Sequence, residues 1–433
     1  MNDHAESALP NIAADMPEPV KSKGFFALLG PGIVTGAADD DPSGIATYSQ
    51  VGAQFGYGLA WTMVFSFPLM TVIQGVAARI GSVTGVGIAR NLRRHYPRGL
   101  LYAVITLLVV ANVINLAADL GAMGSAVALL FGGPEHLYTV VFGIACLLLE
   151  TFMSYERYAA TLKWATLSLF AYVAVVLTAN VPWGPALMGT FIPHLQFNGA
   201  EAMALVAVLG TTISPYLFFW QSSQEVEEQH RRLVKPLCIA PRAAGPELNR
   251  IRTDTIVGMG FSNLIALFII LATAATLHAN GVTDIQTSAQ AAEALRPIAG
   301  PFAFILFATG IIATGMLAVP VLAGSAAYGV GEMADWPVGL ARRPREAKAF
   351  YGIIAIATII GVALNFTAID PVKALYWSAV VNGVLAAPLM AVMMVIAMNG
   401  RIMGRLTLPL PMVIVGWAAT VVMFLASAGF FLL

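Results

Sequence analysis

Eleven long apolar segments make up most of this chain, so few residues remain for a domain outside a membrane. Hydrophobic residues make up 58% of the 433 residues and charged residues 11%, whereas a soluble domain carries about 25% charged residues. A membrane-spanning helix needs about 20 apolar residues. The segments that qualify lie roughly at 25–53, 57–79, 99–122, 136–153, 160–181, 200–222, 254–279, 301–325, 350–366, 372–397 and 411–432, and 125–131 extends the third. We therefore predict an all-α membrane protein with 11 transmembrane helices.

The basic residues are concentrated on one side of these segments. Of the 23 Lys and Arg, 21 fall in the N-terminal tail and in alternate loops, and only Arg296 and Lys373 fall in the others. Because cytosolic loops are rich in Lys and Arg, this predicts a cytosolic N-terminus and an outer C-terminus. We expect a multi-pass protein of the cell membrane, specifically a bacterial inner membrane. Residues 1–23 are polar and lack the apolar core of a signal peptide, so we expect a disordered cytosolic tail.

Two of the apolar segments are interrupted by proline. They read GPGIVTGAADDDPSGIATY over Gly30–Tyr48 and AVLGTTISPYLFFWQ over Ala207–Gln221. These are predicted spans one and six, so the second enters the membrane from the opposite side. Transporters built as inverted repeats bind their substrate near the midplane, between two broken helices. We therefore predict a leucine-transporter-type fold, with a first repeat over 24–181, an inverted second repeat over 200–397 and a final helix over 411–433.

Three consecutive aspartates precede the proline of the first break, at the depth where the bilayer is thickest. Charge there is costly and marks function by default. Pro42 lacks an amide hydrogen and disfavours helix at Asp41, and Gly44 adds flexibility. The carbonyl groups freed before the proline need a partner, and a cation supplies one. Successive helical residues diverge, so we choose Asp41 as the direct ligand and assign Asp39 and Asp40 to surrounding water or the entry path.

The second break offers oxygen ligands only. Ser214 carries a hydroxyl, Thr211 carries another, and Pro215 frees the Thr211 carbonyl. Neither break holds Cys, Met or His. Sites of carboxylate, hydroxyl, carbonyl and water suit Mg²⁺, Ca²⁺ or Mn²⁺, and Mg²⁺ tends to keep several waters. We therefore predict that a largely hydrated divalent cation binds at Asp41, Gly44, Thr211 and Ser214.

Three stretches carry a family resemblance. GPGIVTGAADDDPSGIATYSQVGAQFGYGLAW resembles the first span of the NRAMP family of divalent-metal transporters, which typically shows Asp-Pro-Gly-Asn at the break and Gly-Ala-Gln-Phe-Gly-Tyr beyond it. VLGTTISPYLFFWQSS resembles its sixth span, where Met-Pro-His is usual, and FTAIDPVKALYWSAVVNG resembles the start of its tenth. The resemblance covers nearly the whole chain and implies transport of a divalent metal by alternating access.

The chain departs from this family at the metal ligands. The family's aspartate is retained as Asp41, but its asparagine is replaced by Gly44 and its methionine by Ser214. Methionine is a soft ligand that favours transition metals. Two family histidines are replaced by Tyr216 and Gln221. The resemblance therefore implies weaker discrimination against hard ions.

The third span departs at positions that the family links to proton movement. In ANVINLAADLGAMG the central aspartate is kept as Asp119, while two glutamate positions hold Asn112 and Ala122. With the histidines also missing, the resemblance implies that the proton relay is largely gone. This pattern resembles the NRAMP-related magnesium transporters, a branch that carries Mg²⁺ and Mn²⁺ without proton coupling.

We therefore predict uptake of Mg²⁺, and also Mn²⁺, by alternating access without proton coupling. The alternative is a proton-coupled Mn²⁺ or Fe²⁺ symporter of the usual NRAMP type. An amino-acid transporter of the same plan is disfavoured, because three aspartates would repel a substrate carboxylate. The sequence shows no arrangement of a nucleophile and a base that would indicate an enzyme.

Several residues are candidates for the surroundings of the ion or its path. These candidates are Asp39, Asp40, Asp119, Tyr216, Gln221 and Asn382. For Asp119 and Tyr216 a structural role is as well supported as a role at the ion. For Asn382 a hydrogen bond between helices is favoured over a role at the ion. Because 23 basic residues balance 23 acidic ones, we expect no nucleic-acid partner. The expected partners are divalent cations and the lipid bilayer. We expect a functional monomer without a cofactor, the metal being cargo.

Overall fold

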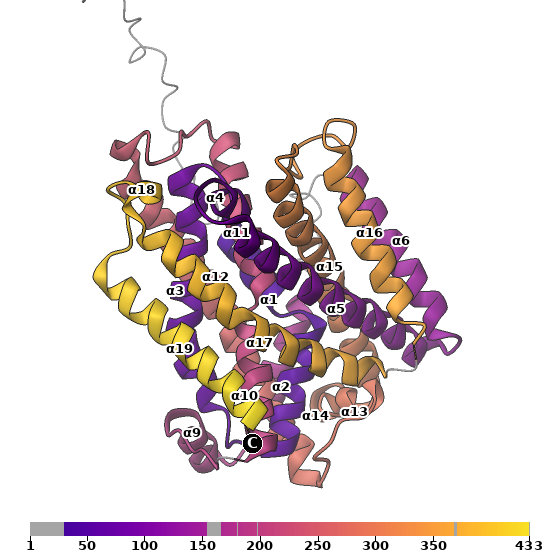
Figure 1. Cartoon of the computed structure of the whole chain (residues 1–433). Helices are drawn as coiled ribbons and strands as arrows, with labels where there is room; N and C mark the ends of the chain where they lie inside the picture. The colour runs from indigo at the N-terminus through magenta and orange to yellow at the C-terminus, as the bar shows by residue number, and fades with distance from the viewer. Residues whose placement is uncertain (1–29, 154–165, 180, 197, 368–369, 433) are drawn as a thin grey trace, which may run out of the picture.

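The computed structural model describes residues 30–153, 166–179, 181–196, 198–367 and 370–432, so the predicted tail at 1–23 lies outside the described residues. All regular elements in the described ranges are helical (Figure 1). Apart from short 3₁₀ turns, they are α1 Pro31–Asp39, α2 Pro42–Phe55, α3 Trp61–Thr84, α4 Ile88–His95, α5 Arg98–Phe131, α6 Glu135–Phe152, α8 Phe170–Thr178, α9 Trp183–Phe191, α10 Gly199–Thr212, α11 Pro215–Arg231, α12 Ala244–Thr276, α13 Ser288–Glu293, α14 Arg296–Ala299, α15 Ala303–Ala334, α16 Lys348–Leu364, α17 Pro371–Met398, α18 Gly400–Met403 and α19 Leu410–Leu432.

Each of the predicted membrane segments contains helix. Within the described residues, eight helical stretches are long and apolar enough to cross a membrane, counting α10 with α11 as one, and α16 is a shorter apolar helix. The broken pair α1–α2 and the short helix α8 fall in the two remaining predicted segments. The extension of the third segment is confirmed, since α5 continues to Phe131. The number of eleven crossings stays a prediction.

Both predicted breaks are confirmed. α1 ends at Asp39 and α2 begins at Pro42, with extended backbone at Asp41. α10 ends at Thr212 and α11 begins at Pro215, again after an extended residue. In each case the proline stands at the first position of the new helix, where its missing N–H has no role.

α12 packs along both halves of the first broken span. A Cβ atom built on Gly36 would lie 2.2 Å from the Gly258 carbonyl oxygen, and one built on Gly258 would lie 2.2 Å from that of Gly32. Small residues allow helix backbones to approach this closely. No side chain therefore separates α1 from α12 at these glycines.

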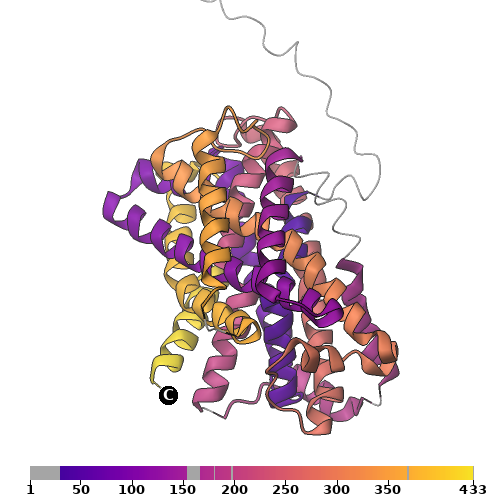
Figure 2. The same ribbon diagram turned by 90° about the vertical axis from the view of Figure 1, so that its right-hand side faces the viewer.

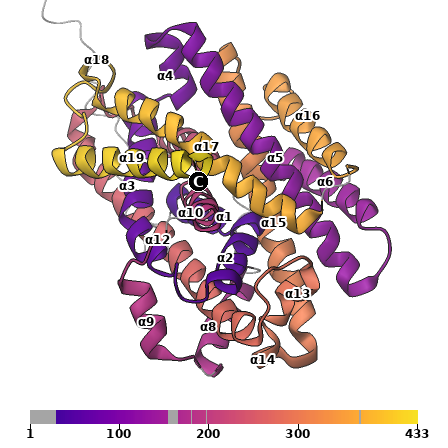
Figure 3. The same cartoon turned by 60° about the horizontal axis from the view of Figure 1, so that its bottom comes forward.

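The second broken span is held in the same way by α17. A Cβ atom on Gly210 would lie 2.1 Å from the Ala379 carbonyl oxygen, and one on Gly383 would lie 2.4 Å from that of Val206. Figures 1 and 3 show α1, α2 and α10 near the centre, with α6 and α16 at one edge of the bundle and α19 at another. Figure 2 shows the long helices side by side. Both breaks therefore lie inside the bundle.

The two ends of the bundle differ in the elements that they carry. α4, whose last turn contains Arg93 and Arg94, lies at the upper end in Figure 1 together with α18. α9, α13 and α14 lie at the lower end. We call these the basic end and the opposite end. The distribution of Lys and Arg along the sequence predicts that the basic end faces the cytosol, and this orientation stays a prediction.

Candidate cation site

Asp41 lies in the gap of the first break and caps α2. Its Oδ1 accepts hydrogen bonds from the Ser43 hydroxyl and the Gly44 amide, both at 2.7 Å. Its Oδ2 accepts from Asn115 Nδ2 at 2.9 Å and from the Tyr216 hydroxyl at 3.2 Å. The side chain is only 1% exposed. Donors at both oxygens suit an ionised carboxylate, which can only accept, so an acidic group stands inside the bundle.

In each break the proline leaves one backbone carbonyl without its helical donor, and that carbonyl accepts a hydroxyl. The carbonyls of Ala38 and Thr211 stand four residues before a proline, so they have no helical donor. The Tyr216 hydroxyl donates to the Ala38 oxygen at 2.8 Å. The Ser214 hydroxyl donates to the Thr211 oxygen at 2.8 Å and to the Gly210 oxygen at 2.9 Å. The predicted freeing of the Thr211 carbonyl is therefore confirmed, with a hydroxyl as its partner.

The two breaks meet at Gly44. A Cβ atom built there would lie 3.2 Å from the Asp39 carbonyl oxygen and 3.2 Å from the Thr211 hydroxyl oxygen. One of these oxygens comes from each broken span. The structure thus brings together Asp41, Gly44 and Thr211, and Ser214 joins them through the Thr211 carbonyl. Oxygen atoms of this kind are the ligands that hard divalent cations prefer.

Side chains alone do not form a closed metal cage. In the ranges that the structure covers, no three His, Cys, Asp or Glu side chains are placed to hold a metal ion together. An ion at the breaks would therefore need carbonyl, hydroxyl and water ligands beside its carboxylates. The sequence predicted such a donor set, and which atoms bind the ion stays a prediction.

Asn115 of α5 belongs to the site, and the sequence reasoning missed it. It donates to Asp41, and its Oδ1 accepts from the Ser378 hydroxyl of α17 at 2.8 Å. Asn115 stands four residues before Asp119, a spacing that places both on one face of α5. That spacing was the available signal. Asp119 is fully buried, and neither of its carboxylate oxygens has a hydrogen-bond partner among the described residues.

The other predicted residues lie in different surroundings. Asp39 and Asp40 contact Ser262 of α12. Gln221 donates to the Thr255 hydroxyl of α12 at 3.1 Å. Asn382 Nδ2 is buried and has no partner within the described part of the chain, so no bond between helices is seen for it. Among the candidates for the surroundings of the ion, Tyr216 thus contacts Asp41 directly.

The two positions of α5 at which the family carries glutamate hold no titratable side chain here. Asn112 Nδ2 donates to the Leu322 carbonyl oxygen of α15 at 3.0 Å, and Ala122 has no titratable group. Met123, however, lies close to the first break. A Cβ atom built on Gly315 of α15 would lie 2.5 Å from the Met123 sulfur and 3.2 Å from Cγ of Pro42. A soft sulfur therefore stands near the site, although neither break contains one in sequence.

The basic end of the bundle is closed over α1. Asp254 of α12 accepts hydrogen bonds from the backbone amides of Gly30, Gly32 and Ile33, at 2.9, 2.7 and 3.3 Å. One turn away, Arg250 forms ion pairs with Glu225 at 2.6 Å and Glu247 at 3.1 Å. A carboxylate at a helix N-terminus is favourable because it meets free N–H groups. These contacts fix the start of α1 against α12.

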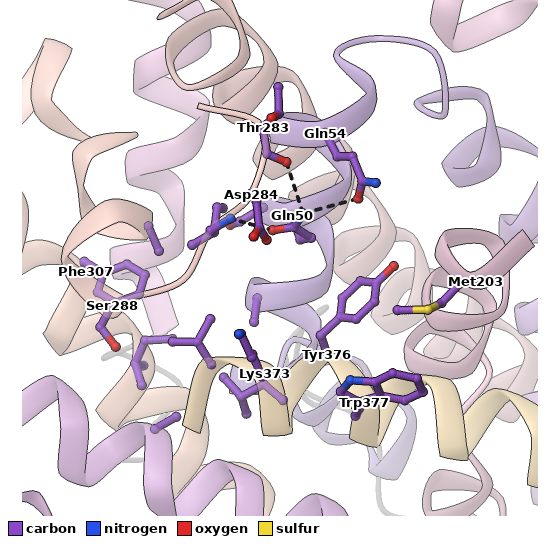
Figure 4. Close-up of a pocket in the computed structure, with 18 of the residues that line it drawn as sticks. Gln50, Gln54, Met203, Thr283, Asp284, Ser288, Phe307, Lys373, Tyr376 and Trp377 are labelled. Carbon is purple, nitrogen blue, oxygen red and sulfur yellow. Dashed lines mark hydrogen bonds between the residues drawn. The ribbon is translucent and has the colours of Figure 1, made fainter. Parts of the chain in front are cut away.

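The opposite end contains a cavity of about 560 Å³ (Figure 4). Its wall includes residues of α2, α10, α13, α15 and α17. Gln50 crosses one side, donating to the Thr283 carbonyl oxygen at 3.3 Å and accepting from the Ile285 amide at 2.9 Å. Ala46, also in the wall, follows Asp41 by five residues, which is about 7.5 Å of helix. The site therefore lies close to a cavity at one end and behind closed contacts at the other.

Comparisons with known proteins agree with this architecture. Residues 32–433 match the family model described as Nramp, natural resistance-associated macrophage protein-like. The divalent metal cation transporter MntH of Deinococcus radiodurans is 30% identical over 313 residues, which are 69% of this chain and 68% of that protein.

Solved structures show the same fold. A manganese transporter of Eremococcus coleocola superposes with a TM-score of 0.73 at 18% identity, covering 95% of this chain and 87% of that one. MhsT, solved in complex with L-phenylalanine, superposes with a TM-score of 0.64 at 12% identity, covering 92% and 98%. The overall fold predicted from the sequence is therefore supported by these superpositions. The division into two inverted repeats stays a prediction.

Proposed function

The chain belongs to the NRAMP family, and from this premise we propose that it transports divalent metal cations across a membrane. The observation that carries the proposal is the meeting of the two breaks at Gly44, with the buried carboxylate of Asp41 beside it. Relatives described as divalent metal cation and manganese transporters support the same class of cargo.

For the transported ion we propose Mg²⁺, with Mn²⁺ also accepted. Support comes from the donor set: Ser214 and Tyr216 stand where the family resemblance leads one to expect a sulfur and an imidazole. A site of carboxylate, carbonyl and hydroxyl oxygens discriminates little against a hard, hydrated ion. A similar solved structure is named as a manganese transporter. The proposed preference for Mg²⁺ therefore depends only on Ser214 and Tyr216 in place of the family's methionine and histidine.

We propose alternating access as the transport mechanism. The cation enters through the cavity at the opposite end, reaches Asp41 and the oxygens around Gly44, and leaves after α1 separates from Asp254 at the basic end. With the basic end in the cytosol, an inside-negative potential favours entry of a divalent ion by about 4.6 kcal/mol per 100 mV. No coupled proton is required, and the surroundings of Asn112 and Ala122 support this.

We also propose an orientation in the membrane, a division into repeats and an oligomeric state. The N-terminus lies in the cytosol and the C-terminus outside, in a bacterial inner membrane. The first repeat covers 24–181, the second covers 200–397, and α19 lies outside both. The protein works as a monomer.

A second candidate function is proton-coupled Mn²⁺ symport. Two observations favour it: the sulfur of Met123 lies near the first break, and both carboxylate oxygens of Asp119 lack a partner in the described residues. A soft ligand favours a transition metal. An unpaired buried carboxylate is a group that can take up a proton.

Transport by purified protein in proteoliposomes tests both candidates. We expect Mn²⁺ uptake that excess Mg²⁺ inhibits strongly, because a site of oxygen ligands accepts both ions. We also expect an internal pH dye to stay constant during uptake. Protein-free vesicles with the same gradients are the control. Mn²⁺ uptake that resists Mg²⁺ and acidifies the lumen in step would select the symporter instead, and absence of any divalent flux would contradict both.

A further inference from the structure

The first break divides its three aspartates between two faces. Asp41 turns toward α5 and α11, where Asn115 and Tyr216 donate to it. Asp39 and Asp40 turn toward α12, where one hydroxyl lies within reach of both. The Ser262 Oγ is 2.7 Å from Asp39 Oδ2 and 3.1 Å from Asp40 Oδ1. The pair of carboxylates at the end of α1, which faces α12, is therefore separate from the carboxylate of Asp41 beside Gly44.

Ser262 alone cannot satisfy this pair. A hydroxyl has a single hydrogen to donate, so two ionised carboxylates cannot both receive a full hydrogen bond from it. The remaining oxygens, Asp39 Oδ1 and Asp40 Oδ2, are buried and have no hydrogen-bond partner in the described part of the chain. Both side chains are 1% exposed. Buried polar atoms are normally paired, and these two oxygens are free to accept a ligand.

Among the residues that the structure describes, no basic side chain lies within ion-pair distance of the pair. Among the ion pairs between described residues, none includes Asp39 or Asp40. Two further carboxylates, those of Asp41 and Asp119, are also buried at this depth. One divalent cation balances two negative charges, so with all four carboxylates ionised a single ion at Asp41 leaves the charges of Asp39 and Asp40 uncompensated. Uncompensated charge in a dry interior is strongly unfavourable.

The hydroxyl is held in place by the helix packing. Ser262 follows Gly258 by four residues, so both lie on one face of α12. At Gly258 that face contacts the backbone of α1 directly. The distance between Ser262 and the end of α1 is thus fixed by contact between two backbones. A site on such elements is already formed before its ligand arrives.

We propose that Asp39, Asp40 and Ser262 form a second cation site, distinct from that at Asp41. Two carboxylates and a hydroxyl are hard oxygen ligands, so the ligand is a divalent cation such as Mn²⁺ or Mg²⁺ that completes its coordination with water. The transporter then carries two divalent ions side by side. This goes beyond the proposed function, which requires one ion, and binding at the second site can be measured without transport.

The test is the number of Mn²⁺ ions bound per purified transporter in detergent, by equilibrium dialysis. We expect two ions on the wild type, one on the double variant Asp39→Asn, Asp40→Asn, and one on Asp41→Asn. Two ions held by adjacent residues are magnetically coupled, so we expect a broadened Mn²⁺ resonance for the wild type and a sharp one for each variant. Size-exclusion profiles verify that the variants are folded.

A milder variant protects the test against misfolding. Ser262→Ala removes one oxygen, and we expect it to weaken one of the two sites at least tenfold while the other is unchanged. The matched control is Ser66→Ala, since Ser66 is also a buried serine but bonds to Asn263 and Met63, with no carboxylate contact. We expect this control to bind two ions with wild-type affinity.

Two results would overturn the proposal. A wild type that binds one Mn²⁺, lost in Asp41→Asn and retained in the double variant, removes the second site and leaves the proposed function intact. A wild type that binds one ion, lost in the double variant and retained in Asp41→Asn, also removes the second site and moves the transported ion away from Asp41. In the first case, a protonated-carboxyl infrared band that disappears in the double variant would identify a shared proton as the ligand.

Discussion

We expect the variant Asp41→Ala to take up no divalent metal above the vesicle background. The carboxylate of Asp41 lies within hydrogen-bond distance of four donor groups, and its removal takes this acceptor and its charge out of the break. Loss of a buried charge partner weakens binding by about 3 kcal/mol or more, which corresponds to at least roughly 100-fold. The measurement is initial Mn²⁺ uptake into proteoliposomes at matched protein density.

The chain supplies its own control for the loss of a helix cap. Asp370 also precedes a proline, and its Oδ1 accepts from the amides of Val372 and Lys373 at the start of α17. It is exposed, unlike Asp41. Replacing an N-cap aspartate by Ala costs about 1 kcal/mol of stability, so we expect Asp370→Ala to keep most of the wild-type uptake. Equal loss in both variants would attribute the effect to capping and contradict a role for the Asp41 charge.

A second large effect is expected at the basic end, where Asp254→Ala should open the structure around α1. Asp254 accepts three backbone amides at the start of α1, and each hydrogen bond to a charged group contributes about 1.5–3 kcal/mol. Even one of these bonds, if absent from the open state, shifts the equilibrium between closed and open forms about tenfold. We therefore expect the interface between α1 and α12 to become accessible from the basic end.

Cysteine labelling measures this opening. Thr35 of α1 is fully buried in the closed structure, so Thr35→Cys in a Cys238→Ser background reports on the interface; Cys146 is buried and stays silent. We expect at least tenfold faster labelling by a water-soluble maleimide with Asp254→Ala. Asp335→Ala is the control, because Asp335 pairs with Arg93 on the surface of the same end. If the cysteine at position 35 is labelled at the same rate in the Asp254→Ala and Asp335→Ala variants, the contacts of Asp254 do not hold α1 closed.

The sequence predicted the breaks because their cause is local. Pro42 and Pro215 each remove one amide and restrict the residue before them, whatever surrounds them. The long helices were predictable from apolar length alone. The helices α9 and α13 were missed, because 9 and 6 residues are too few to cross a bilayer and lie in stretches read as loops.

The partners of the aspartates were not predictable. Asn115 lies 74 residues from Asp41, and Ser262 lies 223 residues from Asp39. Such pairs depend on which faces of α5 and α12 turn inward, and close glycine packing determines this. Helical spacing predicted that the three aspartates do not share one ion. It did not show that α12 would meet two of them with a single hydroxyl.

The hydroxyls on the freed carbonyls have a consequence for the carrier without cargo. When no ion is bound, Tyr216 and Ser214 still donate to the carbonyls of Ala38 and Thr211, so the two carbonyls that the prolines free keep a partner in the empty protein. An uncoupled carrier must return empty across the membrane once per cycle, and a penalty at that step would restrict it to exchanging one ion for another. Internal solvation of the breaks removes that penalty, so vesicles free of internal metal should fill as fast as preloaded vesicles exchange their contents.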